Sequence, residues 1–126
     1  MSTFFFDNNL SPRLVDGLGA FGENVQHLRE TFAPDTKDAI WIPQVAEWEW
    51  ILVTRDKRIR TRPLEIEARV RSGLSAFVFT QKREPVLWGW VELVVRRWAE
   101  IKRLADDERQ PFLIAIPERG SLERLR

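Results

Sequence analysis

Residues 3–12 of the chain read Thr-Phe-Phe-Phe-Asp-Asn-Asn-Leu-Ser-Pro, a short apolar run that passes directly into the signals of a helix start. The run at 3–6 lacks the polar alternation of a half-exposed strand, which is typical of a strand buried on both faces. Ser11 and Pro12 supply a helix cap and a first-turn proline, so a helix is expected to end near the glycines at 19 and 22.

The same alternation of apolar runs and helical segments continues along the chain. Further buried strands are predicted at Val25–Leu28, Trp50–Val53, Ala76–Thr80 and Phe112–Ile116. Further helices are predicted at about Asp38–Trp48, Pro63–Ser72 and Pro85–Ala105. Strands that alternate with helices indicate an α/β fold. We expect a three-layer Rossmann-like sandwich with a mainly parallel five-stranded sheet.

The sequence also predicts which side chains of the helices, and which tryptophans, are buried. Pro43 lies inside the second helix, where it favours a short first turn or a kink. The last helix has one apolar face, formed by Leu87, Val91, Val94, Trp98, Ile101 and Ala105. Its basic side chains are expected on the solvent face: Arg96, Arg97, Lys102 and Arg103. Core positions are expected for Trp50 and Trp98, and more open ones for Trp41, Trp48, Trp88 and Trp90.

The composition suits one globular domain over 1–126, with an extended conformation left open for the tail at 118–126. The 20 Lys and Arg nearly cancel 19 Asp and Glu, so any charge argument has to be local. Disulfides, thiolate zinc sites and cysteine nucleophiles are excluded because there is no Cys, and the lone His27, expected to be structural, cannot build a metal site. The longest apolar stretches are too short to span a bilayer, and the N-terminus lacks a signal-peptide pattern. We expect a cytoplasmic location without membrane contact.

Three acids are expected at the rim where the strands end. Asp7 follows the first strand, Asp56 follows the third, and Asp38 begins the second helix. Hard cations such as Mg²⁺ or Mn²⁺ bind carboxylate oxygens and need neither Cys nor His. Such an ion lowers the pKa of a bound water and neutralises charge on a phosphoryl group. For Asp35 and Asp38 the alternative is helix capping, and for Asp56 it is pairing with a nearby arginine.

A basic loop surrounds the third acid. Five basic residues fall within eight positions, opposed only by Asp56: Arg55, Lys57, Arg58, Arg60 and Arg62. A solvated face is the usual explanation of such a run. Beside a metal-binding acid, however, arginines also serve as phosphate ligands. We therefore assign phosphate contacts with a polyanionic substrate to Arg55, Lys57, Arg58 and Arg60.

Three stretches together carry a family resemblance: Phe5-Phe6-Asp7-Asn8-Asn9-Leu10-Ser11, Asp38-Ala39-Ile40-Trp41-Ile42-Pro43 and Trp50-Ile51-Leu52-Val53-Thr54-Arg55-Asp56-Lys57-Arg58-Ile59. In this order the chain resembles the PIN-like nuclease superfamily, in particular the small VapC-type toxin-like group. The resemblance continues through Trp88 and Trp98 to Phe112.

The resemblance implies a Rossmann-like sheet, Mg²⁺ or Mn²⁺ bound by acids, and RNA cleavage by a metal-activated water. It makes Asp7, Asp38 and Asp56 the catalytic and metal-binding acids, with Thr54, Asn8 and Asn9 in support. Relatives commonly have an acid after the first Asp, whereas this chain has Asn8, which offers a carbonyl oxygen without charge. A toxin of this kind implies an antitoxin protein as partner, and a homodimer through Trp-bearing surfaces is left open.

Two other functions compete with the nuclease. A phosphorelay receiver domain would use Asp7, Asp56 and Thr80, but it needs a lysine after the fifth strand, where this chain has Ile116-Pro117-Glu118. The other alternative is an inert PIN-like binding module, which is suggested by Asn8, the uncharged residue where relatives commonly have an acid.

Overall fold

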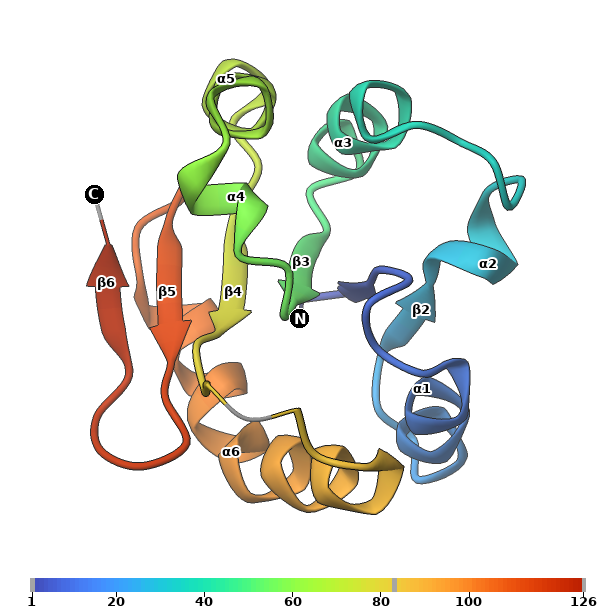
Figure 1. Ribbon diagram of the computed structural model, residues 1–126, viewed down its shortest axis with the longest axis vertical. Coiled ribbons are helices and arrows are strands. Elements are labelled where there is room, and N and C mark those ends of the chain that lie inside the picture. Colours follow the sequence, from blue (N-terminus) through green and yellow to red (C-terminus); the bar gives the residue numbers. More distant parts are fainter. Residues whose placement is uncertain (1, 83, 126) are drawn as a thin grey trace.

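The computed structural model describes residues 2–82 and 84–125. The strands are β1 (Phe4–Phe6), β2 (Val25–His27), β3 (Ile51–Thr54), β4 (Ala76–Phe79), β5 (Leu113–Ile116) and β6 (Glu123–Leu125). The helices are α1 (Pro12–Ala20), α2 (Leu28–Thr31), α3 (Asp38–Glu47), α4 (Arg58–Thr61), α5 (Pro63–Ser72) and α6 (Leu87–Asp107). Figure 1 shows one sheet between two groups of helices, which is the predicted α/β sandwich.

The sheet has the order β2-β1-β3-β4-β5-β6. Its first five strands are parallel, as predicted, and β6 runs antiparallel to β5. The five-strand expectation is therefore one strand short, because part of the tail at 118–126 forms β6. This strand has only three residues, two of them exposed. It contains no apolar run that a sequence pattern could detect.

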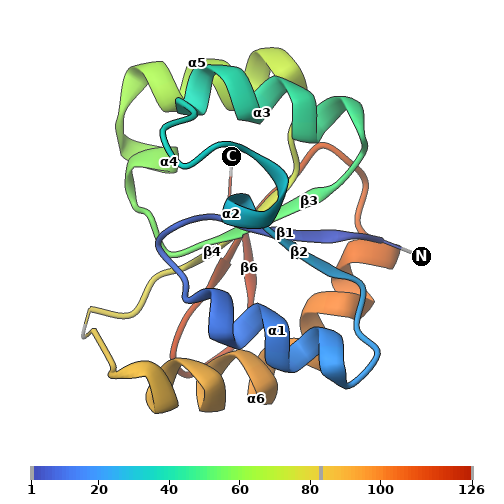
Figure 2. The same cartoon turned by 90° about the vertical axis from the view of Figure 1, so that its right-hand side faces the viewer.

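Both faces of the central strands are buried, which explains their unbroken apolar runs. Phe4 and Phe6 belong to one core cluster and Phe5 belongs to the other. Side chains of α1 and α6 complete the first cluster, and side chains of α3 complete most of the second. Figure 2 shows these helices as separate layers above and below the sheet. The expected burial on both faces is confirmed for β1, β3, β4 and β5, whereas Val25 and Gln26 of the edge strand β2 are only half-buried.

Two tryptophans are more buried than their places at segment ends suggest. Trp41 in α3 is 3% exposed and Trp90 in α6 is 8% exposed, so the expectation that they are open is wrong. Each packs against a phenylalanine ring of the sheet. Trp48 and Trp88 are exposed, as expected. α3 continues through Pro43 to Glu47.

One basic residue of α6 is buried, contrary to expectation. Arg97 is 8% exposed, and its Nη2 donates hydrogen bonds to the carbonyls of Pro117 (3.2 Å) and Gly120 (2.5 Å). Its Nη1 pairs with Glu100 at 2.9 Å. Arg97 thus holds the turn that leads into β6. Within the described ranges, no helix combines the length and apolar character needed to cross a membrane.

Candidate functional site

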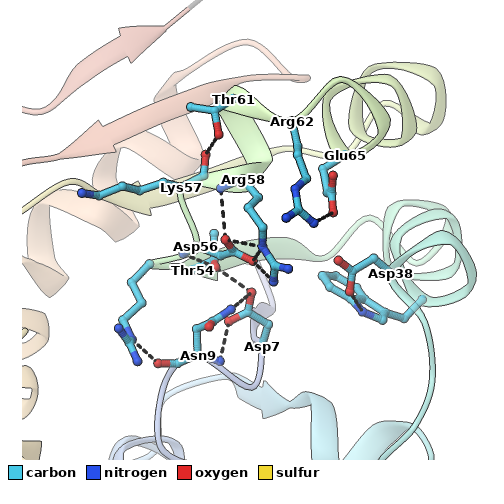
Figure 3. Close-up of polar contacts among 12 residues, drawn as sticks. Asp7, Asn9, Asp38, Thr54, Asp56, Lys57, Arg58, Thr61, Arg62 and Glu65 are labelled. Atoms are coloured by element: carbon cyan, nitrogen blue, oxygen red, sulfur yellow. Dashed lines mark hydrogen bonds and ion pairs between the residues drawn. The ribbon is translucent and has the colours of Figure 1, made fainter.

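Asp7 and Asp56 leave neighbouring parallel strands at the same edge of the sheet. The register pairs Phe6 of β1 with Val53 of β3, so Asp7 lies beside Thr54. The Thr54 hydroxyl donates to Asp7 Oδ2 at 2.6 Å and accepts from the Asp56 backbone N–H at 3.0 Å. Figure 3 shows this fully buried hydroxyl between the two acidic residues. Thr54 therefore fixes the positions of both acids relative to each other.

The Asp7 carboxyl group is buried and only partly compensated. It is 6% exposed, and Asn9 supplies a backbone N–H to Oδ1 (3.1 Å) and a side-chain amide to Oδ2 (3.5 Å). Burial raises the pKa of Asp7 to about 6, against the lowering effect of the hydrogen bonds from Thr54 and Asn9. The charge of Asp56 makes a smaller contribution to this rise. An added cation at this position would favour the charged form of Asp7.

The Asp56 carboxylate is bound by Arg58. Arg58 Nε lies 2.9 Å from both carboxylate oxygens, Nη2 lies 2.6 Å from Oδ2, and the Arg58 backbone N–H donates to Oδ1 at 3.0 Å. Burial alone would raise the pKa of Asp56, but the hydrogen bonds and charge of Arg58 outweigh it and hold this pKa below its usual value. The pairing with an arginine, foreseen as the alternative for Asp56, is therefore present.

Asp38 stands apart from this pair. It is the first residue of α3, after the cap residue Lys37, so it is not the helix cap. Its Oδ1 accepts a hydrogen bond from Trp41 Nε1 at 3.0 Å. In Figure 3 it lies on the far side of the Arg58 side chain from Asp56. Among the residues that the structure describes, no three His, Cys, Asp or Glu side chains are arranged to hold a metal ion.

The prediction that three carboxylates converge is therefore wrong. Asp7 and Asp56 lie together, and Asp38 lies apart from them. The physical reason is local: the Asp38 carboxylate is held by its own helix, through Trp41, while the Arg58 guanidinium binds Asp56. The charge of Asp38 nevertheless helps to raise the pKa of Arg58, after the larger effect of Asp56. Asp38 therefore acts on the site through Arg58.

A fourth acid faces the same guanidinium and was not singled out from the sequence. Glu65 lies in the first turn of α5, and its charge also contributes to the raised pKa of Arg58. The side chain is 16% exposed, with Oε1 4.0 Å from Arg62 Nη1. Its Oε2 is buried without a hydrogen-bond partner in the described ranges. An acid two residues after Pro63 is an ordinary helix-start signal, so only the fold distinguishes it.

The remaining predicted phosphate ligands differ in their exposure and in the partners that they bind. Lys57 and Arg60 are exposed, as is Asn8 in the loop after β1. Arg55 donates to the Asn9 carbonyl, pairs with Glu84 and lies 5.5 Å from the centroid of the Trp90 ring. A cavity of about 330 Å³ beside Asp56 is lined in part by Arg55 and Lys57.

The two joined acids fit a hydrated divalent ion. Mg²⁺ commonly keeps several waters and binds through one or two carboxylates together with substrate phosphates. Asp7 and Asp56 offer two carboxylates at one edge of the sheet, and neither a thiolate nor an imidazole is needed. Both oxygens of Asp56 are covered by Arg58, so a metal ligand role for Asp56 requires this side chain to turn away.

Comparison with known protein families supports the assignment of the chain to a family. The model of a family described as PIN like domain matches residues 2–81. This segment is more than half of the chain and contains β1 to β4 with Asp7, Asp38, Asp56 and Glu65. No curated protein and no solved structure matches the chain significantly.

Proposed function

Because the chain belongs to the PIN-like domain family, which is of nuclease type, we propose that it is a metal-dependent endoribonuclease that hydrolyses RNA phosphodiesters. The observation that carries the proposal is the pair Asp7 and Asp56, joined through the Thr54 hydroxyl at the edge of the sheet. We further propose that the protein is the toxin of a toxin–antitoxin pair.

Asp7 and Asp56 are the residues that would hold Mg²⁺ or Mn²⁺, with Asp38 and Glu65 facing the same region. When bound, such an ion supplies an acidified water and a positive charge for the phosphoryl oxygens. Thr54 and Asn9 orient the Asp7 carboxylate through the hydrogen bonds described above. Burial of Asp7 keeps water from competing for its oxygens and strengthens its attraction for a cation.

The basic loop is proposed to bind the RNA backbone. Lys57 and Arg60 are exposed beside Asp56, and Arg55 lines the neighbouring cavity. The Arg58 guanidinium binds the Asp56 carboxylate in fork geometry, with Nε on Oδ1 and Nη2 on Oδ2, and the same geometry suits a phosphate. We propose that Arg58 exchanges Asp56 for an RNA phosphate when metal and substrate enter.

Two alternatives remain to be separated by experiment. Asn8 is exposed but has no negative charge with which to bind a cation, which favours an inert PIN-like binding module. The parallel strands have the order 2-1-3-4-5, which receiver domains also have, so the sheet alone does not distinguish them. The PIN-like match favours the nuclease over the receiver, and a small phosphodonor that labels Asp56 would favour the receiver.

The deciding experiment is RNA cleavage with Mg²⁺ or Mn²⁺ by the wild-type chain and by Asp7→Asn and Asp56→Asn. We expect both variants to lose metal-dependent cleavage while keeping the far-UV circular dichroism of the wild type. Asp16→Asn is the matched control, because Asp16 is an exposed acid on α1. Full cleavage by either site variant would refute the site. A wild type that neither cleaves RNA nor binds Mn²⁺ in calorimetry would favour the inert module.

The toxin proposal has its own test. An antitoxin should offer an arginine or a basic segment to Asp7 and Asp56, because a guanidinium or ammonium group pairs with a carboxylate. Co-expression with the product of the adjacent reading frame should abolish cleavage and restore growth. A neighbour without effect on cleavage would remove the toxin role and leave the nuclease proposal standing.

A further inference from the structure

A buried arginine lies at the opposite end of the sheet from the acids. Arg69 is on the last turns of α5, and its side chain is 9% exposed. Its Nε is buried without a hydrogen-bond partner in the described part of the chain. Burial lowers the pKa of Arg69, and no carboxylate contributes to the shift. A buried guanidinium nitrogen without a partner is costly, which makes a missing anionic partner worth seeking.

Arg69 borders a cavity of about 330 Å³, which we call the Arg69 pocket. Apolar side chains form most of its wall: Val70, Pro111, Leu113 and Leu125. Leu113 of β5 and Leu125 of β6 are register partners and so stand on the same face of the sheet. The volume lies at the lower end of the range of small-molecule sites. An apolar ligand body of a few carbon atoms would fit this wall.

The number of uncompensated positive charges in the Arg69 pocket indicates which anion it would bind. Arg124 also borders it, but its Nη1 lies 3.4 Å from Glu108 Oε2 and its Nη2 donates to the Pro111 carbonyl at 3.2 Å. Arg69 is therefore the one uncompensated cation among the residues that line the cavity. A single guanidinium balances one negative charge, and its planar fork matches a carboxylate. A phosphate dianion would keep one charge unpaired in an apolar wall.

We propose that the Arg69 pocket binds a small organic monocarboxylate, with the carboxylate on Arg69 and an apolar body against Leu113 and Leu125. The pocket lies near the first residue of β5, whereas Asp7 and Asp56 follow the last residues of β1 and β3. The site is therefore separate from the proposed nuclease site and does not depend on it.

The test is an NMR titration of the full-length ¹⁵N-labelled chain with hexanoate, which has one carboxylate and a five-carbon tail. We expect saturable shifts at the backbone amides of Val70, Leu113 and Leu125, with a Kd on the order of 1 mM for so small a ligand. Hexanamide has the same shape without the charge and should bind at least about tenfold more weakly. Equal binding of hexanamide and hexanoate would overturn the role of Arg69.

Variants separate binding from folding. Arg69→Gln should lose the hexanoate shifts, while Arg71→Gln, which removes an exposed arginine of the same helix, should keep them. If Arg69→Gln does not fold, Arg69→Lys keeps the charge without the fork and should bind hexanoate several-fold more weakly than the wild type. Absence of saturable shifts in the wild type up to about 10 mM would overturn the proposal. So would tighter binding of inorganic phosphate than of hexanoate.

Discussion

Replacement of Asp7 by Asn should stabilise the protein, and the gain should depend on pH. The pKa of this carboxyl group rises from an ordinary value of 3.8 to about 6 on folding, mainly because of burial. The folded state therefore binds a proton more tightly than the unfolded state. Stability is lost as pH rises from about 4 through 6, and the loss is complete above that range. The two pKa values correspond to a cost of about 3 kcal/mol at neutral pH.

Urea unfolding of wild type and Asp7→Asn at about pH 7.5 and at about pH 4 measures this cost. The amide also changes the contacts with Asn9 and Thr54, but that effect is similar at both pH values and cancels in the difference. We expect the variant to gain about 3 kcal/mol relative to wild type between the low and the high pH, or roughly 10 °C in Tm. Asp16→Asn serves as the control for removal of one negative charge. A pH-dependent gain below about 1 kcal/mol would refute the argument that burial of a charged Asp7 is costly.

Three further results should follow. Thr54→Val should destabilise the fold by about 1–3 kcal/mol in urea unfolding, because the Asp56 backbone N–H loses its acceptor. Thr54→Ser keeps the hydroxyl and should cost only about 1 kcal/mol for the lost buried methyl group, so a Thr54→Val variant more stable than Thr54→Ser would contradict this role. Arg58→Ala should bind Mn²⁺ roughly fivefold more tightly in calorimetry, because the metal no longer has to replace an arginine whose attraction to Asp56 amounts to about 1 kcal/mol. Weaker binding would contradict the proposed exchange. Arg97→Met should cost about 2–3 kcal/mol through the freed carbonyls of Pro117 and Gly120, and a neutral effect would show that the turn does not need Arg97.

The strands and the long helices follow closely from the sequence because burial on both faces leaves an unmistakable pattern. Residues 4–6, 51–54 and 76–79 contain almost nothing but apolar side chains, and each forms a central strand. The four-residue helices α2 and α4 and the strand β6 were missed, since their formation depends on neighbours already in place. β6, for example, is held by its pairing with β5.

The candidate site was predictable in part for a related reason. The alternation of elements predicts a parallel sheet with Asp7 and Asp56 at the same edge, whereas the strand order that makes β1 and β3 neighbours and brings Asp7 beside Thr54 is seen only in the structure. The orientation of Asp38 depends on a single hydrogen bond to Trp41, and the approach of Glu65 depends on how α5 packs. Packing of helices on a sheet is a tertiary property, so no local spacing in the sequence predicts either position.

The two edges of the sheet have a consequence for self-association. The edge strands β2 and β6 have three residues each, so each presents only a few backbone groups to a neighbouring chain. Extended, flat edges are what allow two chains to join into one continuous sheet. Two copies of this protein would gain little from such a junction. A dimer would have to form through side chains instead, and among the described residues Trp48 and Trp88, together with Phe21, are large apolar groups that are exposed for that contact.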